Sequence, residues 1–435
     1  IRLAIPTMLA QLVNVLYSIV DRMYIGTGVG SLALAGVGVC APIVTLLTSF
    51  GSMVGQGGAP IMAMQMGSGD HKSAKQTLNN GFFMLLVLSA VLTGLFLLTK
   101  DQLLMWFGAS EATFSYANTY VTIYTAGTFF ALISGGLNSF LIAQGFSGLG
   151  MATVVLGAVL NIILDPVFIF IFHMGVAGAA IATISSQFFS ACMVVYALTH
   201  TEDMYKLVWS KVRIDGRMLQ RIVRIGIPAG MQSVMYNISN IIIQSGVNTL
   251  GTDNVTAWAT YGKVDGLYWM MINALGISVT TFVGQNYGAG RMDRVHKGAG
   301  ACMIIGTIMT AIVSTLLYLK GYLLIDLFTS DAQVQEIGLS LIHFLVPTLI
   351  TYITIEILSG TLRGVGDAWM PLIMTGIGVC CLRVIWIIFF LPQYRSILAA
   401  AFCYPMSWTI TSVAFVVYYF FFSSLRRVDG RKWFQ

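Results

Sequence analysis

Charged residues are scarce in this chain. Asp, Glu, Lys and Arg make up 9% of its 435 residues, whereas about a quarter of an ordinary soluble domain is charged. Hydrophobic residues reach 57%, and the mean hydropathy is +0.82. This composition excludes a soluble globular protein and predicts an integral membrane protein that lies mostly within the bilayer.

Cysteine motifs and short alternating strands are also missing. The six cysteines all lie in apolar runs without a C-x-x-C pair, so we expect buried thiols and no disulfide framework or metal site. The long apolar runs predict helices and not the alternating strands of a transmembrane β-barrel. No metal-binding His/Glu motif, Ser/His pair or phosphate-binding glycine loop lies near a membrane face. The chain is therefore predicted not to be an enzyme and to need no cofactor.

The recurring apolar runs predict an all-α fold of twelve transmembrane helices. The second, fourth, eighth and tenth runs are overlong and should tilt, kink or project beyond the membrane. The predicted spans are 3–26, 32–66, 77–99, 112–143, 152–172, 176–200, 222–250, 254–287, 298–320, 334–362, 370–391 and 397–423.

Lys and Arg are distributed unevenly among the connecting segments. With both termini inside, 16 of the 23 lie in inner segments, three in outer segments, and four in or beside spans. The positive-inside rule then predicts a multi-pass protein of the cell (inner) membrane with both termini in the cytoplasm. The same bias accounts for the net charge of +6, so no nucleic-acid partner is expected.

The two halves of the sequence resemble one another. Residues 2–6, 66–69 and 143–151 match residues 224–228, 287–290 and 362–370, at offsets of 222, 221 and 219. An even number of spans per half predicts two parallel six-helix lobes, related by a pseudo-twofold axis along the membrane normal, with a substrate path between them. The predicted division is a first lobe at 1–205, a cytoplasmic linker at 206–221, a second lobe at 222–425 and a basic tail at 426–435.

A polar stripe runs along the first predicted helix. Gln11, Asn14, Ser18 and Asp21 are spaced to share one face, and an acid at membrane depth costs about 2.5–3.5 kcal/mol at the helix centre. A structural hydrogen bond or ion pair would offset that cost, and so would a functional ion. At the repeat offset of 222, Asp21 corresponds to Ile243, so only the first half carries an acid here.

The fifth and sixth predicted helices carry a second group of oxygen-bearing side chains. Asn161 and Asp165 are four residues apart on one helical face, and Pro166 should bend the helix there. Together with Asp21 and Thr183 they would suit a hard monovalent cation. Alternatively, the two carboxyl groups share a proton, or Asp165 merely caps the kink.

The second half has its own intramembrane charges, namely Lys263, Asp265, Glu356 and Arg383, with His343 nearby in sequence. We expect an internally neutralised cluster, while the alternative makes Asp265 or Glu356 a drug counter-ion. Abundant Met and aromatic residues suit broad, planar, cationic ligands. The residues predicted to contact substrate are Gln11, Asn14, Tyr17, Ser18, Tyr120, Met231, Tyr236, Asn237, Asn240, Trp258, Asp265 and Glu356.

Several of these motifs resemble one known family. The run 19–26 (IVDRMYIG) is similar to the first helix of the multidrug and toxic compound extrusion (MATE) transporters. Runs 161–169 and 178–183 resemble the fifth and sixth helices of that family, and 283–290 and 363–367 resemble its eighth- and tenth-helix ends. The similarity covers essentially the whole chain, and it is strongest to the DinF-like bacterial branch.

The resemblance implies two six-helix lobes around a central cleft, with an extracellular cation exchanged for a cytoplasmic drug. It carries over a cation site, with Na⁺ as a possible ligand, at Asp21, Asn161, Asp165 and Thr183. Members with a second-lobe Na⁺ site are expected to have an acid in the seventh helix, and this chain has none there. Ion coupling is therefore expected in the first lobe.

These observations predict a polyspecific multidrug efflux antiporter. It should export amphipathic, often cationic compounds in exchange for H⁺ or Na⁺ by alternating access, and work as a monomer in the lipid bilayer. Its partners would be small-molecule drugs or toxic compounds. The main alternative is a flippase for lipid-linked saccharide precursors, which should have a more basic cavity.

Overall fold

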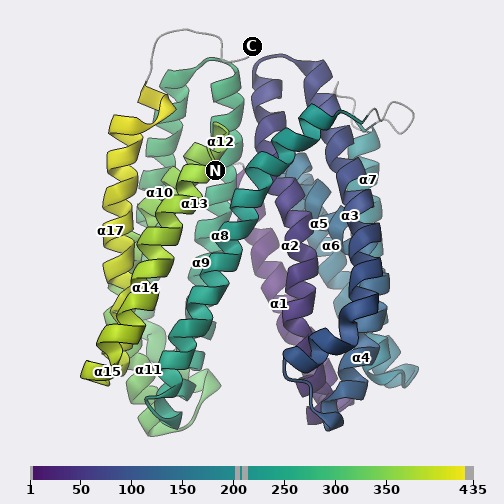
Figure 1. Ribbon diagram of the computed structural model, residues 1–435. Helices are drawn as coiled ribbons and strands as arrows, with labels where there is room; N and C mark the ends of the chain where they lie inside the picture. The colour runs from purple at the N-terminus through teal and green to yellow at the C-terminus, as the bar shows by residue number, and fades with distance from the viewer. Residues whose placement is uncertain (1–2, 201–205, 208–213, 427–435) are drawn as a thin grey trace. The chain divides into compact units, whose positions relative to one another are not determined.

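A computed structural model describes residues 3–200, 206–207 and 214–426 of the chain, and the described residues form helices and no strands. The first half contains α1 (Ala4–Gly28), α2 (Ser31–Gly67), α3 (His71–Trp106), α4 (Glu111–Ala126), α5 (Thr128–Ala143), α6 (Ser147–Pro166), the π-helical turn η1 (Val167–Ile171) and α7 (Gly175–His200). Figure 1 shows these helices in purple to teal.

The second half follows the same order of spans. It contains α8 (Gly216–Asn248), α9 (Thr252–Gly288), α10 (Met292–Phe328), α11 (Ala332–Leu345), the 3₁₀ segment η3 (Val346–Thr351), α12 (Ile353–Gly364), α13 (Trp369–Thr375), η4 (Gly376–Cys381), α14 (Leu382–Ile385), η5 (Trp386–Phe390), α15 (Leu391–Tyr394), α16 (Ile397–Ala401), α17 (Cys403–Val417), η6 (Tyr418–Phe422) and η7 (Ser424–Arg426). Segments η4, η5 and η6 are π-helical.

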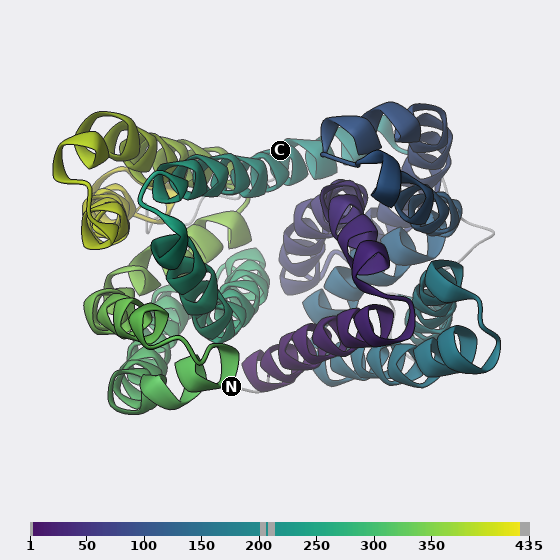
Figure 2. The same ribbon diagram turned by 90° about the horizontal axis from the view of Figure 1, so that it is seen from below.

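The chain divides into two compact units, residues 1–230 and 231–435, with the boundary inside α8. The helices of each unit appear end-on as a bundle in Figure 2. This all-α, two-unit architecture confirms the predicted fold class. Parts of the predicted linker and tail, including Lys211, Arg213 and Arg427, lie outside the described residues.

Among the described residues, ten helical segments are long and apolar enough to cross a membrane, and a bent pair makes eleven. That pair is α4 and α5, which meet at an angle of 57°, so the fourth predicted span is broken at Gly127. The remaining predicted span is α8, which has 33 residues. Its polar stripe, Ser233, Asn237, Asn240 and Gln244, keeps its hydropathy below that of the others.

The internal repeat extends to the backbone geometry of the turns. Gly30, Gly69 and Gly145 have φ angles of 118°, 75° and 92°, and the glycines 221 residues later have 101°, 68° and 88°. Glycine suits each position because it adopts positive φ without steric cost. The same turns therefore connect corresponding helices in both halves, and the turn at Gly145 corresponds to Gly366 at an offset of 221, not at the 219 expected from the sequence.

Close packing in the first unit depends on small residues facing one aromatic ring. Phe140 of α5 is fully buried, and a Cβ on Gly58 of α2 or Gly81 of α3 would lie 2.2 or 2.5 Å from its Cζ atom. These glycines let α2 and α3 approach α5 around the ring. The core of the first unit thus holds three helices in fixed register.

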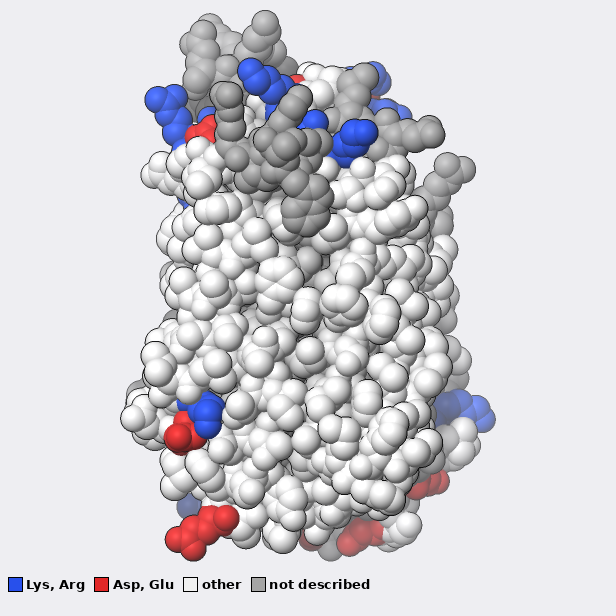
Figure 3. Space-filling model, turned by 90° about the vertical axis from the view of Figure 1, so that its right-hand side faces the viewer, with Lys and Arg blue, Asp and Glu red and all other residues white. Residues whose placement is uncertain are grey.

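Charge is segregated along the protein. On the face drawn in Figure 3, Lys and Arg gather at one end, most acids lie at the other, and a broad band between them is nearly uncharged. This pattern is typical of a membrane-spanning protein with a basic inner face.

Candidate cation site

The candidate site lies where α1 packs against α6. A Cβ on Gly28 would lie 2.6 Å from Ile169 of η1, so the end of α1 lies directly against the segment that follows Pro166. Asp21, two turns earlier on α1, is only partly exposed. The close approach of these two helices brings Asp21 toward the acid of α6.

Asp165 and Asn161 lie on the buried face of α6. Asp165 is 0% exposed and Asn161 is 1% exposed. The Nδ2 atom of Asn161 lies 3.4 Å from Asp165 Oδ1 and 3.4 Å from Thr183 Oγ1 on α7. Both hydrogen bonds are long. The amide therefore connects the two helices and orients the Asp165 carboxyl.

The two acids lie within electrostatic range of each other across α1 and α6. Tyr17, one turn before Asp21, lies within electrostatic range of both carboxyl groups. From α4, the buried Tyr120 hydroxyl lies close to Thr183, and its ring stacks on Tyr124 at 6.1 Å between centroids. Four helices of the first unit thus converge on one polar group.

Three oxygens of this group have no hydrogen-bond partner among the described residues: Asp21 Oδ1, Asn161 Oδ1 and Asp165 Oδ2. Buried polar atoms without partners are costly, and hard cations prefer oxygen ligands of this kind. No described cluster contains three or more His, Cys, Asp or Glu side chains. Two carboxyl groups and an amide fit a proton or a monovalent cation.

The alternative in which Asp165 only caps a kink has less support. Regular α-helix ends at Pro166 and the π-helical turn η1 follows, as expected for a proline in a helix. The hydrogen bond accepted by the Asp165 carboxyl comes from the Asn161 side chain. No backbone group at the turn donates to it among the described hydrogen bonds.

The predicted substrate-contacting residues of the first unit separate into two groups. Asn14 is exposed, and Gln11, Tyr17 and Ser18 are partly exposed along α1. Tyr120 is instead 6% exposed and lies close to Thr183 of the candidate cation site. The sequence pattern did not predict this proximity, because it joins α4 to α7.

The predicted substrate-contacting residues of the second unit are spread over three helices. On α8, Met231, Asn237 and Asn240 are exposed and Tyr236 is partly exposed. On α9, Trp258 is partly exposed, and its ring lies 5.9 Å from that of Tyr404. Whether any of them contacts substrate stays a prediction.

The four charges of the second half do not pair as one group: Asp265 interacts electrostatically with Arg383, whereas Glu356 and Lys263 have other neighbours. Glu356 of α12 lies 3.7 Å from Arg363 and accepts a hydrogen bond from the Tyr352 hydroxyl at 3.2 Å. Lys263 is exposed, with its Nζ atom 4.9 Å from the Phe328 ring centroid. His343 contacts the Tyr318 carbonyl at 3.2 Å.

The pairing of Glu356 with Arg363 was not predicted, because Arg363 directly follows the predicted span 334–362 and counts among the basic residues of the inner segments. A spacing of seven residues puts Glu356 and Arg363 on the same face of a helix two turns apart, and this signal could have revealed the pair. Asp265 accepts a hydrogen bond from Nε1 of Trp269, while Arg383 is 2% exposed and lies over the Tyr404 ring.

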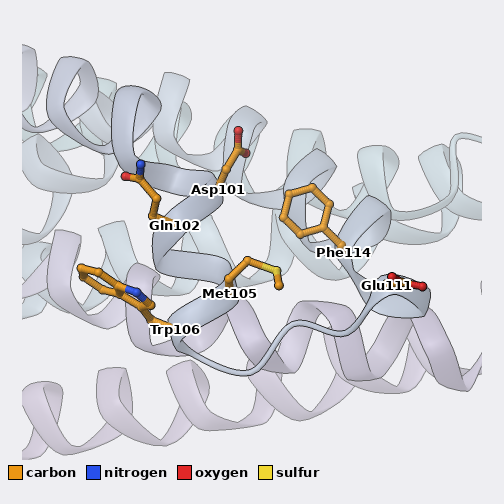
Figure 4. Close-up of a pocket in the computed structure, with 6 residues that line it drawn as sticks. All are labelled: Asp101, Gln102, Met105, Trp106, Glu111 and Phe114. Atoms are coloured by element: carbon orange, nitrogen blue, oxygen red, sulfur yellow. The ribbon is translucent and has the colours of Figure 1, made fainter.

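A pocket of about 600 Å³ lies away from the cation site, at the turn between α3 and α4. Figure 4 shows its lining, formed by Asp101, Gln102, Met105, Trp106, Glu111 and Phe114. Trp106 is 80% exposed. An exposed Trp beside acids is typical of a membrane–water interface, and none of the predicted site residues lines this pocket.

Comparison with known proteins identifies relatives of the whole chain. The MatE family model matches it twice, at residues 6–167 and 228–389, so the two matches are offset by 222 residues. The probable multidrug resistance protein YpnP of Bacillus subtilis is 27% identical over 385 residues, which is 87% of this chain and 85% of YpnP. The multidrug export protein MepA of Staphylococcus haemolyticus is 22% identical over 84% of this chain and 80% of MepA.

Solved structures show the same fold. A MATE protein in its bent conformation aligns with a TM-score of 0.91 at 22% identity, over 98% of this chain and 95% of that one. A MOP-superfamily transporter from Pyrococcus furiosus aligns with a TM-score of 0.89 at 22% identity, over 96% and 93% of the two chains.

Proposed function

Because this chain belongs to the MatE family, whose members are membrane transporters and not enzymes, we propose that it exports amphipathic, often cationic compounds in exchange for H⁺ or Na⁺. The names of its relatives, a multidrug export protein and probable multidrug resistance proteins, support small drugs or toxic compounds as substrates. We place it in the cell membrane as a monomer with cytoplasmic termini, divided at 205 and 222 as the sequence predicts.

One observation carries the proposal: the carboxyl groups of Asp21 and Asp165, each with an unpartnered oxygen among the described residues, lie within electrostatic range of each other between α1 and α6. Two negative charges held this close repel each other when both are ionised. A bound cation removes that repulsion and strengthens the packing of α1 against α6. Loss of the cation weakens the same contact, so the position of α1 depends on ion occupancy.

The side chains around the acids have separate tasks in this mechanism. Asn161 holds the Asp165 carboxyl in place and joins it to Thr183. Na⁺ would be held by oxygens of Asp21, Asn161, Asp165 and Thr183, whereas a proton would be shared by the two carboxyl groups. In either case the ion favours one position of α1, and alternating access follows from that preference.

No observation favours the alternative of a flippase for lipid-linked saccharides. A pyrophosphate group would need free basic side chains in the membrane region. Among the described residues, Arg363 lies beside Glu356 and the buried Arg383 lies against an aromatic ring. Both guanidinium groups are engaged within the protein, and the exposed Lys263 lies against the Phe328 ring.

The Asp21→Asn variant tests the proposal. Ethidium efflux from vesicles should depend on an imposed ΔpH or ΔNa⁺ in the wild type, and it should fall at least about tenfold in the variant. Asp101→Asn is the matched control, because this acid is exposed on α3 and pairs with Lys100 at 2.9 Å. Equal membrane levels with undiminished ion-driven efflux in Asp21→Asn would contradict the proposal.

A further inference from the structure

The second half contains a counterpart of α6, formed by the segments from α13 to η5. One extra residue in this counterpart sets how the two helices align. The preceding turns correspond at an offset of 221, from Gly145 to Gly366. The two family matches both begin and end at an offset of 222, with their ends at residues 167 and 389. The π-helical turn η4, at Gly376–Cys381, has no counterpart in the regular α-helix of α6. A π-helical turn accommodates one additional residue, so positions beyond η4 correspond at 222.

At this offset the chemistry of the cation site is inverted. Asp21 and Asp165 correspond to Ile243 and Ile387, which are 1% and 5% exposed. Asn161 corresponds to Arg383. The second half therefore has apolar side chains where the first has acids, and a permanent positive charge where the first has a neutral amide.

The contacts of Arg383 support this correspondence. Asn161 reaches Thr183 on the following helix, and the Arg383 guanidinium lies 4.1 Å from the ring centroid of Tyr404, 221 residues after Thr183. One turn further on, Ser186 and Ser407 each hydrogen-bond to the carbonyl of these residues, at 2.7 and 2.9 Å. The two side chains thus occupy equivalent places between equivalent helices.

The environment of Arg383 is suited to a buried cation. Its Nε atom donates to Ser407 Oγ at 3.0 Å, and the Trp408 ring lies 5.6 Å away. Aromatic faces attract guanidinium groups, more so where water is excluded. Asp265 of α9 interacts electrostatically with Arg383. Its Oδ1 atom is buried without a hydrogen-bond partner among the described residues.

We infer that Arg383 is a resident cation, built into the position of the second half that corresponds to the exchangeable cation site of the first. This inference rests on the proposed function for its account of the first half. The guanidinium balances Asp265 and repels any mobile cation from this place. The second half then binds no ion, and each chain exchanges one cation at the first half alone.

The test counts the cations bound by the purified full-length protein in detergent. Equilibrium dialysis with radioactive Na⁺ and proton uptake in weak buffer give the number for each variant. We expect one per chain in the wild type and in Arg383→Lys, which keeps the charge. Arg383→Gln should bind two, since Asp265 is then free to take a cation, and adding Asp265→Asn should return the number to one.

The outcomes separate this inference from the proposed function. If Asp21→Asn loses its cation but Arg383→Gln still binds one, the resident-cation inference is overturned while the first-half site stands. If Asp21→Asn keeps its cation and Arg383→Gln gains one, the proposed site fails, while the exclusion of a second cation by Arg383 stands. A gain of one cation in Arg383→Lys as well would also overturn the inference, because the charge is retained.

A second comparison covers the case in which Arg383→Gln does not fold. Removing both charges in Arg383→Gln/Asp265→Asn should restore a folded protein, because Asp265 no longer needs a counter-ion. If the double variant is recovered no better than the single one, the side chain acts through its packing and not its charge. That result would overturn the inference.

Discussion

Asn161 hydrogen-bonds to Asp165 one turn further along α6, with 3.4 Å between Nδ2 and Oδ1. Both of its amide protons are used, because Nδ2 also contacts Thr183. This leaves Asn161 Oδ1 and Asp165 Oδ2 buried and without partners among the described residues. The amide is therefore an orienting group for the acid, and its removal should affect ion coupling more than folding.

Replacing Asn161 with Leu should lower ion-driven efflux about 10- to 100-fold, the usual effect of removing a group that orients a ligand. The substitution keeps the side-chain size but removes the donor to Asp165 and the carbonyl oxygen. Efflux in vesicles under ΔpH or ΔNa⁺ gives the measurement. Asn138→Leu is the control, since that amide contacts the Gly150 carbonyl outside the site. Equal losses in both variants would refute a specific role for Asn161.

Replacing Gly58 with Ala should destabilise the first unit by about 1–3 kcal/mol, because the added methyl group collides with the buried Phe140 ring. Thermal unfolding in detergent measures the effect. Gly94→Ala is the matched control: a Cβ there meets no atom within 4 Å, and Ala favours the helix by about 0.5–1 kcal/mol. The packing argument fails if Gly58→Ala unfolds no earlier than Gly94→Ala.

Asp70 caps the start of α3, where its Oδ1 atom accepts the Ser73 N–H at 3.0 Å. Hydrogen bonds from Ser73 lower the pKa of this exposed carboxyl. Its stabilising effect is therefore present above the unfolded-state pKa of about 3.9 and disappears as the pH falls through the lower folded-state value. Asp70→Ala should cost about 1 kcal/mol at neutral pH and less in strong acid.

The corresponding residue of the second half supplies the control for this cap. Arg291 precedes α10 without a side-chain capping hydrogen bond, so Arg291→Ala should change the melting temperature little. Asp70→Asn should keep most of the stability at neutral pH, because Asn is also a good N-cap. A similar loss from Asp70→Ala at every pH would contradict the capping account.

Asp215, directly before α8, is hydrogen-bonded to α3. Its Oδ2 atom accepts a hydrogen bond from Gln76 at 3.1 Å, and its Oδ1 atom accepts one from the Arg217 N–H at 2.9 Å. Asp215→Ala removes both and should lower the free energy of unfolding by about 1–2 kcal/mol. Asp293→Ala, which removes an exposed acid that contacts Arg291 at 3.5 Å, should cost much less. Comparable melting temperatures for the two variants would argue against a stabilising role of these two hydrogen bonds.

Local sequence patterns were sufficient to predict a membrane protein, to detect the internal repeat and to single out the acids of the first half. The apolar runs reflect the thickness of the bilayer, and an acid inside such a run stands out whatever surrounds it. The spacing of Asn161 and Asp165 on one helical turn was also visible in the sequence. These features depend on residues close together in the chain.

Contacts between helices were not predictable in the same way. The sequence grouped Lys263 with Asp265 and Glu356, whereas Glu356 lies beside Arg363 and Lys263 is exposed. It also treated the fourth span as one helix, although α4 and α5 meet at 57°. Such partners depend on how each helix is rotated and where it crosses its neighbours, and hydrophobic patterns do not specify either quantity closely enough.

The sequence by itself determined that this chain is a duplicated helical membrane protein with acids in its first half, because hydrophobicity and local spacing encode those features directly. Only the tertiary structure decided which side chains meet. It brought Tyr120 close to Thr183, and it placed Arg383, which follows the π-helical turn η4, against the Tyr404 ring. One residue within a helical turn rotates every later side chain by about 100°, so the contacts follow from three-dimensional packing and not from the pattern alone.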